Sequence, residues 1–147
     1  MAAVLAPSIY LDANVLIYAV EAGSPWTAQL YRLFSRINAG EVAAKTSELA
    51  LAEVLPKPLS LGSEALVETY EVLLSSATAL QAVAIDRPIL RTTARLRGAL
   101  RLKLADAIHV ATALESGCTH FVTNDTQILG SLPQPLVGVP MHDIDQL

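Results

Sequence analysis

The chain has 147 residues, enough for one domain with a substantial buried core. Its hydrophobic fraction of 52% and charged fraction of 16% exclude an intrinsically disordered chain. The formal net charge of −4 argues mildly against a protein that wraps nucleic acid, and the single cysteine excludes both an internal disulfide and a zinc site built from cysteines.

The single cysteine suits a protein of the reducing cytoplasm, and no export or membrane segment is convincing. Residues 1–7 are apolar but lack the basic start of a signal peptide, and Asp12 interrupts the apolar stretch that follows. The longest purely apolar stretches fall far short of the roughly 20 residues that a membrane helix needs. We therefore expect neither an export signal nor a membrane-spanning segment.

Short apolar stretches alternate with helical patterns through the first half of the chain. Apolar residues at every third or fourth position are typical of helices, and short apolar runs between turn residues are typical of buried strands. The pattern predicts, in order, a strand at 8–11, a helix at 15–20, a helix capped by Ser24 with Pro25 in its first turn and ending at Gly40, a strand at 42–44, a helix capped by Thr46 or Ser47 and ending before Pro56, a turn at 59–62, and a helix capped by Ser63.

The second half continues the same alternation. It predicts a strand at 82–85, a helix opened by Asp86 and Pro88 and ending near Gly98, a helix at 104–116, a strand at 120–123, a helical turn at 126–129 and an edge strand at 136–139, flanked by prolines. Alternating strands and helices favour an α/β fold, in which a short central parallel sheet is flanked by helices on both faces. We expect one domain over residues 1–147. In such sheets, ligands bind beyond the carboxyl ends of the strands.

Basic residues are concentrated in one short segment. It contains six of the ten basic residues: Arg87, Arg91, Arg95, Arg97, Arg101 and Lys103. Arg87, Arg91 and Arg95 recur every four positions and share one helical face. This face is either a solvated helix surface or a local docking strip for phosphates or for an acidic partner segment.

Four acidic residues are candidates for a functional site. Asp12 directly follows the first strand and Asp125 follows the fourth, so both are expected at the carboxyl edge of the sheet. Glu53 and Asp106 lie in largely apolar helical segments, where a carboxylate is costly unless it is paired or bound to a metal. An acid after a strand can also be a simple turn former or helix cap, and a helical acid can lie on a wet face.

Four converging carboxylates would repel one another at neutral pH, and a divalent cation is the usual remedy. A set of oxygen ligands suits Mg²⁺ or Mn²⁺ rather than zinc. Such an ion activates water and offsets the charge of a phosphodiester in the transition state. The residues therefore indicate metal-assisted hydrolysis of a phosphate ester.

Four segments of the chain resemble the motifs of the PIN-domain family, in the family's order. They are IYLDANVLIY at 9–18, TSELALAEVL at 46–55, LADAIHVATAL at 104–114 and FVTND at 121–125. In the second motif the functional acid is Glu53 rather than Glu48. The resemblance spans nearly the whole chain, and the compact length is similar to that of VapC-type toxins.

This resemblance implies a Mg²⁺- or Mn²⁺-dependent endoribonuclease that is the toxin of a type II toxin–antitoxin pair, with a cognate antitoxin protein and a homodimeric state. Asp12 and Asp106 match the main direct metal ligands, and Glu53 and Asp125 complete the acidic quartet. Asn14, Ser47, Thr123 and Asn124 would be polar groups that orient the carboxylates or contact phosphate.

Two alternatives to a nuclease remain open. The domain could be a catalytically silent PIN-like scaffold that binds RNA or protein, although the intact acids argue against this. An acid-rich phosphatase is disfavoured, because the second position after Asp12 is Asn14 rather than an aspartate. His109, one helical turn after Asp106, could be a base, but a role in helix packing is favoured because metal-activated water needs no histidine.

Overall fold

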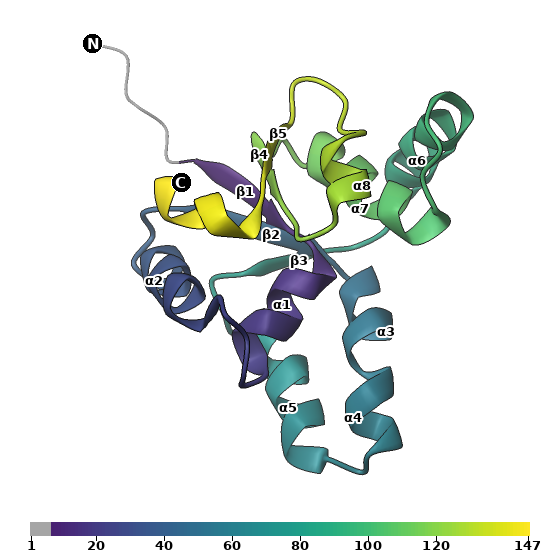
Figure 1. Cartoon of the computed structure of the whole chain (residues 1–147). Coiled ribbons are helices and arrows are strands. Elements are labelled where there is room, and N and C mark those ends of the chain that lie inside the picture. Colours follow the sequence, from purple (N-terminus) through teal and green to yellow (C-terminus); the bar gives the residue numbers. More distant parts are fainter. Residues whose placement is uncertain (1–6) are drawn as a thin grey trace.

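The computed structural model describes residues 7–147, which form a five-stranded parallel sheet between layers of helices (Figure 1). The sheet has the order β3-β2-β1-β4-β5, and every neighbouring pair is parallel. Its strands are β1 (Ser8–Leu11), β2 (Ala43–Ser47), β3 (Gln81–Val83), β4 (His120–Val122) and β5 (Val137–Val139). The predicted α/β class is confirmed, and β5 is an edge strand as expected.

The helices fill the connections between the strands. They are α1 (Ala13–Val20), α2 (Thr27–Asn38), α3 (Leu49–Val54), α4 (Pro56–Ser60), α5 (Glu64–Leu73), α6 (Arg87–Ala99), α7 (Leu104–Glu115), α8 (Thr126–Leu129) and the 3-10 helix η1 (Met141–Gln146). Within residues 7–147, no helix is long and apolar enough to cross a membrane. The expectation of a missing export signal concerns mainly residues 1–6, which lie outside the described part of the chain.

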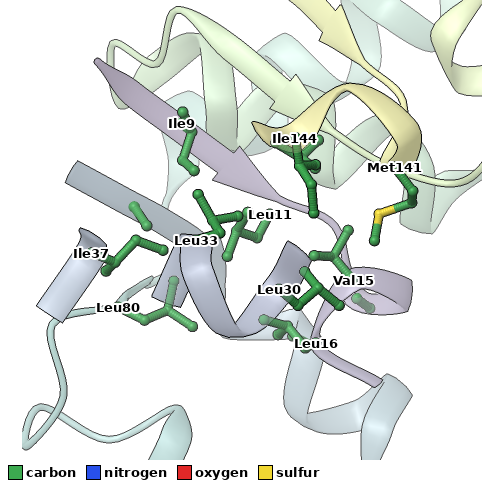
Figure 2. Close-up of a cluster of buried hydrophobic side chains, with 14 of the residues drawn as sticks. Ile9, Leu11, Val15, Leu16, Leu30, Leu33, Ile37, Leu80, Met141 and Ile144 are labelled. Carbon is green, nitrogen blue, oxygen red and sulfur yellow. The ribbon is translucent and has the colours of Figure 1, made fainter. Parts of the chain in front are cut away.

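The two faces of the sheet bury separate hydrophobic cores. Side chains of a strand point alternately to opposite faces, so Ile9 and Leu11 of β1 join one core while Tyr10 joins the other. Figure 2 shows the first core, where β1 packs against α1, α2 and η1. The second core packs Tyr10 and Phe121 against α6, α7 and α8, which lie on the opposite side in Figure 1. Helices on both faces were predicted, and this arrangement confirms them.

The strand order reverses between β1 and β4, and we call the position beyond the carboxyl ends of these two strands the crevice, after the general rule for such sheets. From β1 the chain builds outward through β2 and β3, and then crosses to the other side of β1 to form β4 and β5. At such a reversal of strand order the connections leave in opposite directions, which opens a site at the carboxyl ends of the two strands. Asp12 follows β1 and Thr123 follows β4, so the fold brings both residues to this point.

Among the boundaries that differ from the predictions, three have a clear structural reason. The Ser24 hydroxyl accepts from the Trp26 amide in a preceding turn, so α2 begins only at Thr27. The predicted strand at 42–44 instead extends to Ser47, because β1 and β3 both pair with it. The predicted turn at 59–62 begins inside α4, a short helix that Pro56 opens. The Asp86 cap of α6 is confirmed, since its carboxylate accepts from the Ile89 amide at 3.0 Å.

A buried tyrosine ties α5 to the helices on either side of it in the first layer. The Tyr70 hydroxyl on α5 donates to Glu21 Oε2 at 2.6 Å, and Lys57 Nζ on α4 donates to Glu21 Oε1 at 2.9 Å. The Tyr70 hydrogen bond, followed by the Lys57 hydrogen bond, holds the pKa of Glu21 below its usual value. The folded state therefore prefers the charged carboxylate.

Tyr70→Phe is expected to lower the free energy of unfolding by about 1.5–3 kcal/mol at pH 7, the usual range for a hydrogen bond to a charged group. Because the folded pKa of Glu21 is depressed, this stabilisation is present above the unfolded pKa and is lost as pH falls through the folded pKa. Urea unfolding at several pH values measures the difference. Tyr31→Phe, at a side chain that is 76% exposed, is the matched control. A deficit that persists unchanged at acidic pH would contradict the role of Glu21.

Candidate functional site

Asp12 is the buried carboxylate at the crevice, with 4% of the residue exposed. Its Oδ1 accepts from the Ala13 amide at 2.9 Å, which caps α1, and its Oδ2 accepts from the Thr123 hydroxyl at 2.7 Å. Burial raises the pKa of Asp12, while His109 and the Thr123 hydrogen bond oppose that rise. Donors from both strand ends therefore fix the orientation of the Asp12 carboxylate. They do not fully offset the cost of burying its charge, because its pKa is still raised.

Polar residues after β1 and β4 join the two strand ends. Asn14 Nδ2 donates to Thr123 Oγ1 at 3.2 Å and lies 3.4 Å from Asp12 Oδ2. The Asn124 amide donates to Asn14 Oδ1 at 3.2 Å, and the Asp125 amide donates to Thr123 Oγ1 at 3.0 Å. Asn14, Thr123 and Asn124, three of the four predicted supporting residues, thus belong to one network around Asp12.

Asp106 and Asp125 approach the same crevice from different elements. Asp106 is half-buried in the first turn of α7, and its carboxylate accepts no hydrogen bond from residues 7–147. Burial raises the pKa of Asp106, and the charges of Asp12 and Asp125 raise it further. Asp125 caps α8, where its Oδ1 accepts from the Gln127 amide at 2.8 Å. Asp106 on α7 and Asp125 after β4 are therefore both electrostatically linked to the strand end that carries Asp12.

Glu53 reaches this neighbourhood through His109. Glu53 lies on α3, and its Oε1 is hydrogen-bonded to His109 Nε2 on α7. The same nitrogen lies 3.8 Å from Asp12 Oδ1, and the other ring nitrogen, Nδ1, lies 2.5 Å from the Tyr10 hydroxyl. Burial lowers the pKa of His109, but the Glu53 hydrogen bond and the charges of Asp12, Glu53 and Asp106 outweigh it and raise that pKa above its usual value.

His109 differs from its sequence-based interpretation. It is fully buried, as expected of a packing residue, but both ring nitrogens contact polar groups. The available signal was its spacing of one helical turn from Asp106, which places both on the same side of α7. The contact with Tyr10 has no signal in the local sequence, because it depends on how α7 packs across β1.

The remaining predicted residues lie apart from this network. Ser47, at the end of β2, accepts from the Leu49 amide with its hydroxyl at 3.1 Å and so opens α3. Arg87, Arg91 and Arg95 lie on the exposed face of α6. Across residues 7–147, no group of three or more His, Cys, Asp and Glu side chains is gathered closely enough to hold a metal ion. The acids therefore share a neighbourhood without forming a closed ligand cage.

The basic residues of α6 and the α6–α7 connection are unpaired in the described part of the chain. We call this set the basic strip; it consists of Arg87, Arg91, Arg95, Arg97, Arg101 and Lys103. All six are exposed, and none forms an ion pair within residues 7–147. The other four basic residues all have partners: Arg32 with Asp145, Arg36 with Glu41, Lys57 with Glu21, and Lys45 with the Ser116 carbonyl.

Comparisons with known proteins agree with this architecture. The family model described as PIN domain matches residues 9–130. A VapBC2 structure from Rickettsia felis, bound to a promoter DNA fragment, has a TM-score of 0.71 at 17% identity, covering 90% of this chain and 98% of the other. DNA-bound VapBC from Salmonella typhimurium has a TM-score of 0.69 at 18% identity, covering 92% and 98%.

A third structure is described with an activity. VapC20 from Mycobacterium tuberculosis, a toxin that cleaves the sarcin–ricin loop, has a TM-score of 0.66 at 14% identity, covering 83% of this chain and 93% of the other. No curated protein sequence matches the chain. At these identities the solved structures establish the shared fold, and the family model extends over the carboxylate positions from Asp12 to Asp125.

Proposed function

Since the chain belongs to the PIN-domain family, we propose that it is a divalent-metal-dependent endoribonuclease that hydrolyses RNA phosphodiester bonds in the cytoplasm. The observation that carries this proposal is geometric: Asp12 is buried at the end of β1, the Thr123 hydroxyl after β4 donates to it at 2.7 Å, and Asp125 caps the helix that follows β4. Burial also raises the pKa of Asp12 and of Asp106, and perturbed carboxylates are typical of functional sites. The resemblance to a toxin that cleaves the sarcin–ricin loop supports RNA as the substrate class.

The donor set fits Mg²⁺ or Mn²⁺. All candidate ligands are carboxylate oxygens, and Asp106 has oxygens that no residue among 7–147 satisfies. Mg²⁺ binds through one or two carboxylates and keeps several waters, so it does not require the closed cage that is absent here. We assign Asp12 and Asp106 as direct ligands, with Glu53 and Asp125 completing the site. A cation held there would offset the charge that develops on the phosphodiester.

The chain's own residues pre-orient the site. Each Asp12 oxygen has a fixed donor, Ala13 for Oδ1 and Thr123 for Oδ2, so the carboxylate cannot rotate freely. Asn14 is in turn fixed by the Asn124 amide. Such outer partners hold metal ligands in orientation and reduce the ordering that binding must otherwise supply. Ser47 serves this role only indirectly, by fixing the start of the helix that carries Glu53.

We further infer two protein partners. The similar structures include two VapBC structures and one described as a toxin–antitoxin complex from Klebsiella pneumoniae, which supports a cognate antitoxin for this chain. A cluster of carboxylates would accept a basic side chain from such a partner. Self-association as a homodimer is the second inference, and light scattering on the purified chain tests it directly. We assign the basic strip to RNA rather than to the antitoxin. A protein that acts on RNA needs a cationic surface. Among residues 7–147, every basic residue outside the strip already has a polar partner.

Mn²⁺ is expected to stabilise the wild-type fold, because an ion that binds only the folded state shifts the unfolding equilibrium by mass action. At a concentration one hundred times its dissociation constant, the gain is about 2.7 kcal/mol. Thermal unfolding with increasing Mn²⁺ measures it. The Asp12→Asn/Asp106→Asn double variant serves as the control and should gain nothing. Equal responses of both proteins, or none in either, would mean that Asp12 and Asp106 hold no metal and would favour a binding scaffold over a nuclease.

A further inference from the structure

His109 connects three elements of the fold through one buried ring. It lies on α7 with no exposed surface, between Tyr10 on β1 and Glu53 on α3. Its neighbours on the same helix, Ala107, Ile108 and Val110, are buried and apolar. An apolar side chain would satisfy packing at such a position without the cost of burying two polar nitrogens. The imidazole therefore has a task beyond filling space.

The two contacts define the direction of the hydrogen bonds. A carboxylate can only accept, so His109 Nε2 carries the proton that Glu53 Oε1 receives. The Tyr10 hydroxyl is hydrogen-bonded to Nδ1 on the other side of the ring. Tyr10 itself stacks on Phe121, with ring centroids 5.0 Å apart. The His109 ring cannot rotate or flip without losing its hydrogen bonds to both Tyr10 and Glu53. Tyr10 is in turn fixed by packing in the second core.

Glu53 depends on this contact for its orientation. Its side chain is 31% exposed, and His109 is its hydrogen-bonding partner within residues 7–147. A long acidic side chain on a six-residue helix otherwise samples several rotamers, which costs free energy to fix. With His109 Nε2 at 3.8 Å from Asp12 Oδ1, the same nitrogen directs Glu53 toward the carboxylate neighbourhood.

We propose that His109 is a positioning residue, which holds the Glu53 carboxylate beside Asp12 and is itself held by Tyr10. This inference rests on the proposed function in one respect, namely that Glu53 belongs to the metal site. His109 acts through Glu53 and does not touch the substrate. Its contribution is the orientation of one ligand, so its loss should weaken metal binding as well as cleavage.

Two isosteric substitutions separate the two ring nitrogens. The amide nitrogen of Gln lies as far from Cγ as Nε2, whereas that of Asn corresponds to Nδ1. His109→Gln therefore keeps a donor for Glu53, and His109→Asn keeps only the side facing Tyr10. We expect His109→Asn to weaken Mn²⁺ binding about tenfold or more, the range for lost outer partners of a ligand, and His109→Gln to retain most of the affinity. Isothermal titration with Mn²⁺ alone measures this, and RNA cleavage should follow the same order.

Glu53→Ala provides the coupling test. If His109 acts through Glu53, His109→Asn should cost nothing further once Glu53 has been removed, so the two changes are not additive. An NMR measurement without metal tests the same contact. The Nε2–H proton of His109 should give a slowly exchanging NMR signal in the wild type, which Glu53→Ala shifts or removes and which Tyr31→Phe leaves in place. Since Glu53 is partly exposed, this variant should fold even if His109→Asn does not.

The outcomes distinguish this inference from the proposed function. A wild-type protein that cleaves no RNA, but whose Nε2–H signal depends on Glu53 and whose Mn²⁺ affinity falls in His109→Asn, would support the positioning role and refute the nuclease. Conversely, equal Mn²⁺ affinities of His109→Gln and His109→Asn, additive effects with Glu53→Ala, or an Nε2–H signal indifferent to Glu53 would overturn the positioning role even in an active ribonuclease.

Discussion

Asp106→Asn is expected to lower RNA cleavage more than about a hundredfold, because loss of a mere outer partner of a metal ligand already costs tenfold to hundredfold. The fold should persist, since the Asp106 carboxylate accepts no hydrogen bond from residues 7–147 and the amide has nearly the same shape. Cleavage of a structured RNA with Mn²⁺, compared at equal protein concentration, measures the effect. Asp143→Asn makes the same chemical change in η1, away from the crevice, and should retain activity.

The same variant should be at least as stable as the wild type without metal. Burial, and then the charges of Asp12 and Asp125, raise the folded pKa of Asp106 above its ordinary value of 3.8. A raised folded pKa means that the wild type loses stability as pH climbs from the unfolded pKa to the folded one. The asparagine variant lacks this loss, so its advantage should appear above that window in urea unfolding. Wild-type cleavage rates in Asp106→Asn, or cleavage that survives excess EDTA, would refute the proposed function.

The sequence predicted the fold where local patterns and sheet topology agree. The alternation of strands and helices led to a parallel sheet with two covered faces, and Ile9, Tyr10 and Leu11 confirm that β1 is buried on both. The predicted end of a strand was wrong where pairing with a neighbouring strand determines it. β2 continues through Thr46 and Ser47 because β3 pairs with Lys45, Thr46 and Ser47, and no local signal in that segment reveals this pairing. The helix α4 was missed because its prolines suggest a turn.

The candidate site was predicted less completely. Asp12 and Asp125 follow from the rule that sites lie beyond the carboxyl ends of parallel strands, and the structure brings Asp106 into their electrostatic range. Glu53 was expected to complete the carboxylate quartet, but its hydrogen bond to His109 was not predicted. That pairing depends on the crossing of α3 and α7, a tertiary property. The carboxylates' roles stay a prediction until the variants are measured.

The basic strip is the other feature whose removal should have a large effect. The chain has a net charge of −4, yet six of its ten basic residues lie together and unpaired in the described structure. Arg87, Leu90, Arg91 and Ala94 line a shallow groove of about 510 Å³ on α6. The strip continues to Lys103, directly before the helix that carries Asp106. Burial raises the pKa of Asp106, and Lys103 is close enough to oppose that rise.

Replacing Arg87, Arg91 and Arg95 together with Gln is expected to weaken RNA binding about tenfold or more and to reduce the salt dependence. Each phosphate contact to a single strand contributes about 0.7 to the slope of log K against log salt, so losing three should lower the slope by about 2. Binding is measured in the Asp106→Asn background, which prevents cleavage. The matched control removes three paired cations instead: Arg32, Arg36 and Lys57, each replaced with Gln.

The control separates a docking path from bulk charge. Both triple variants change the net charge by the same amount, so a general electrostatic effect would weaken both equally and contradict an assignment of the strip to RNA. If only the strip variant binds RNA more weakly and with a smaller salt dependence, then bound RNA places its phosphates along α6, next to the carboxylates. If the strip variant binds RNA like the wild type but no longer binds the antitoxin, the strip faces an acidic protein segment and the assignment is wrong. The arginines are exposed, so loss of fold cannot mimic either result.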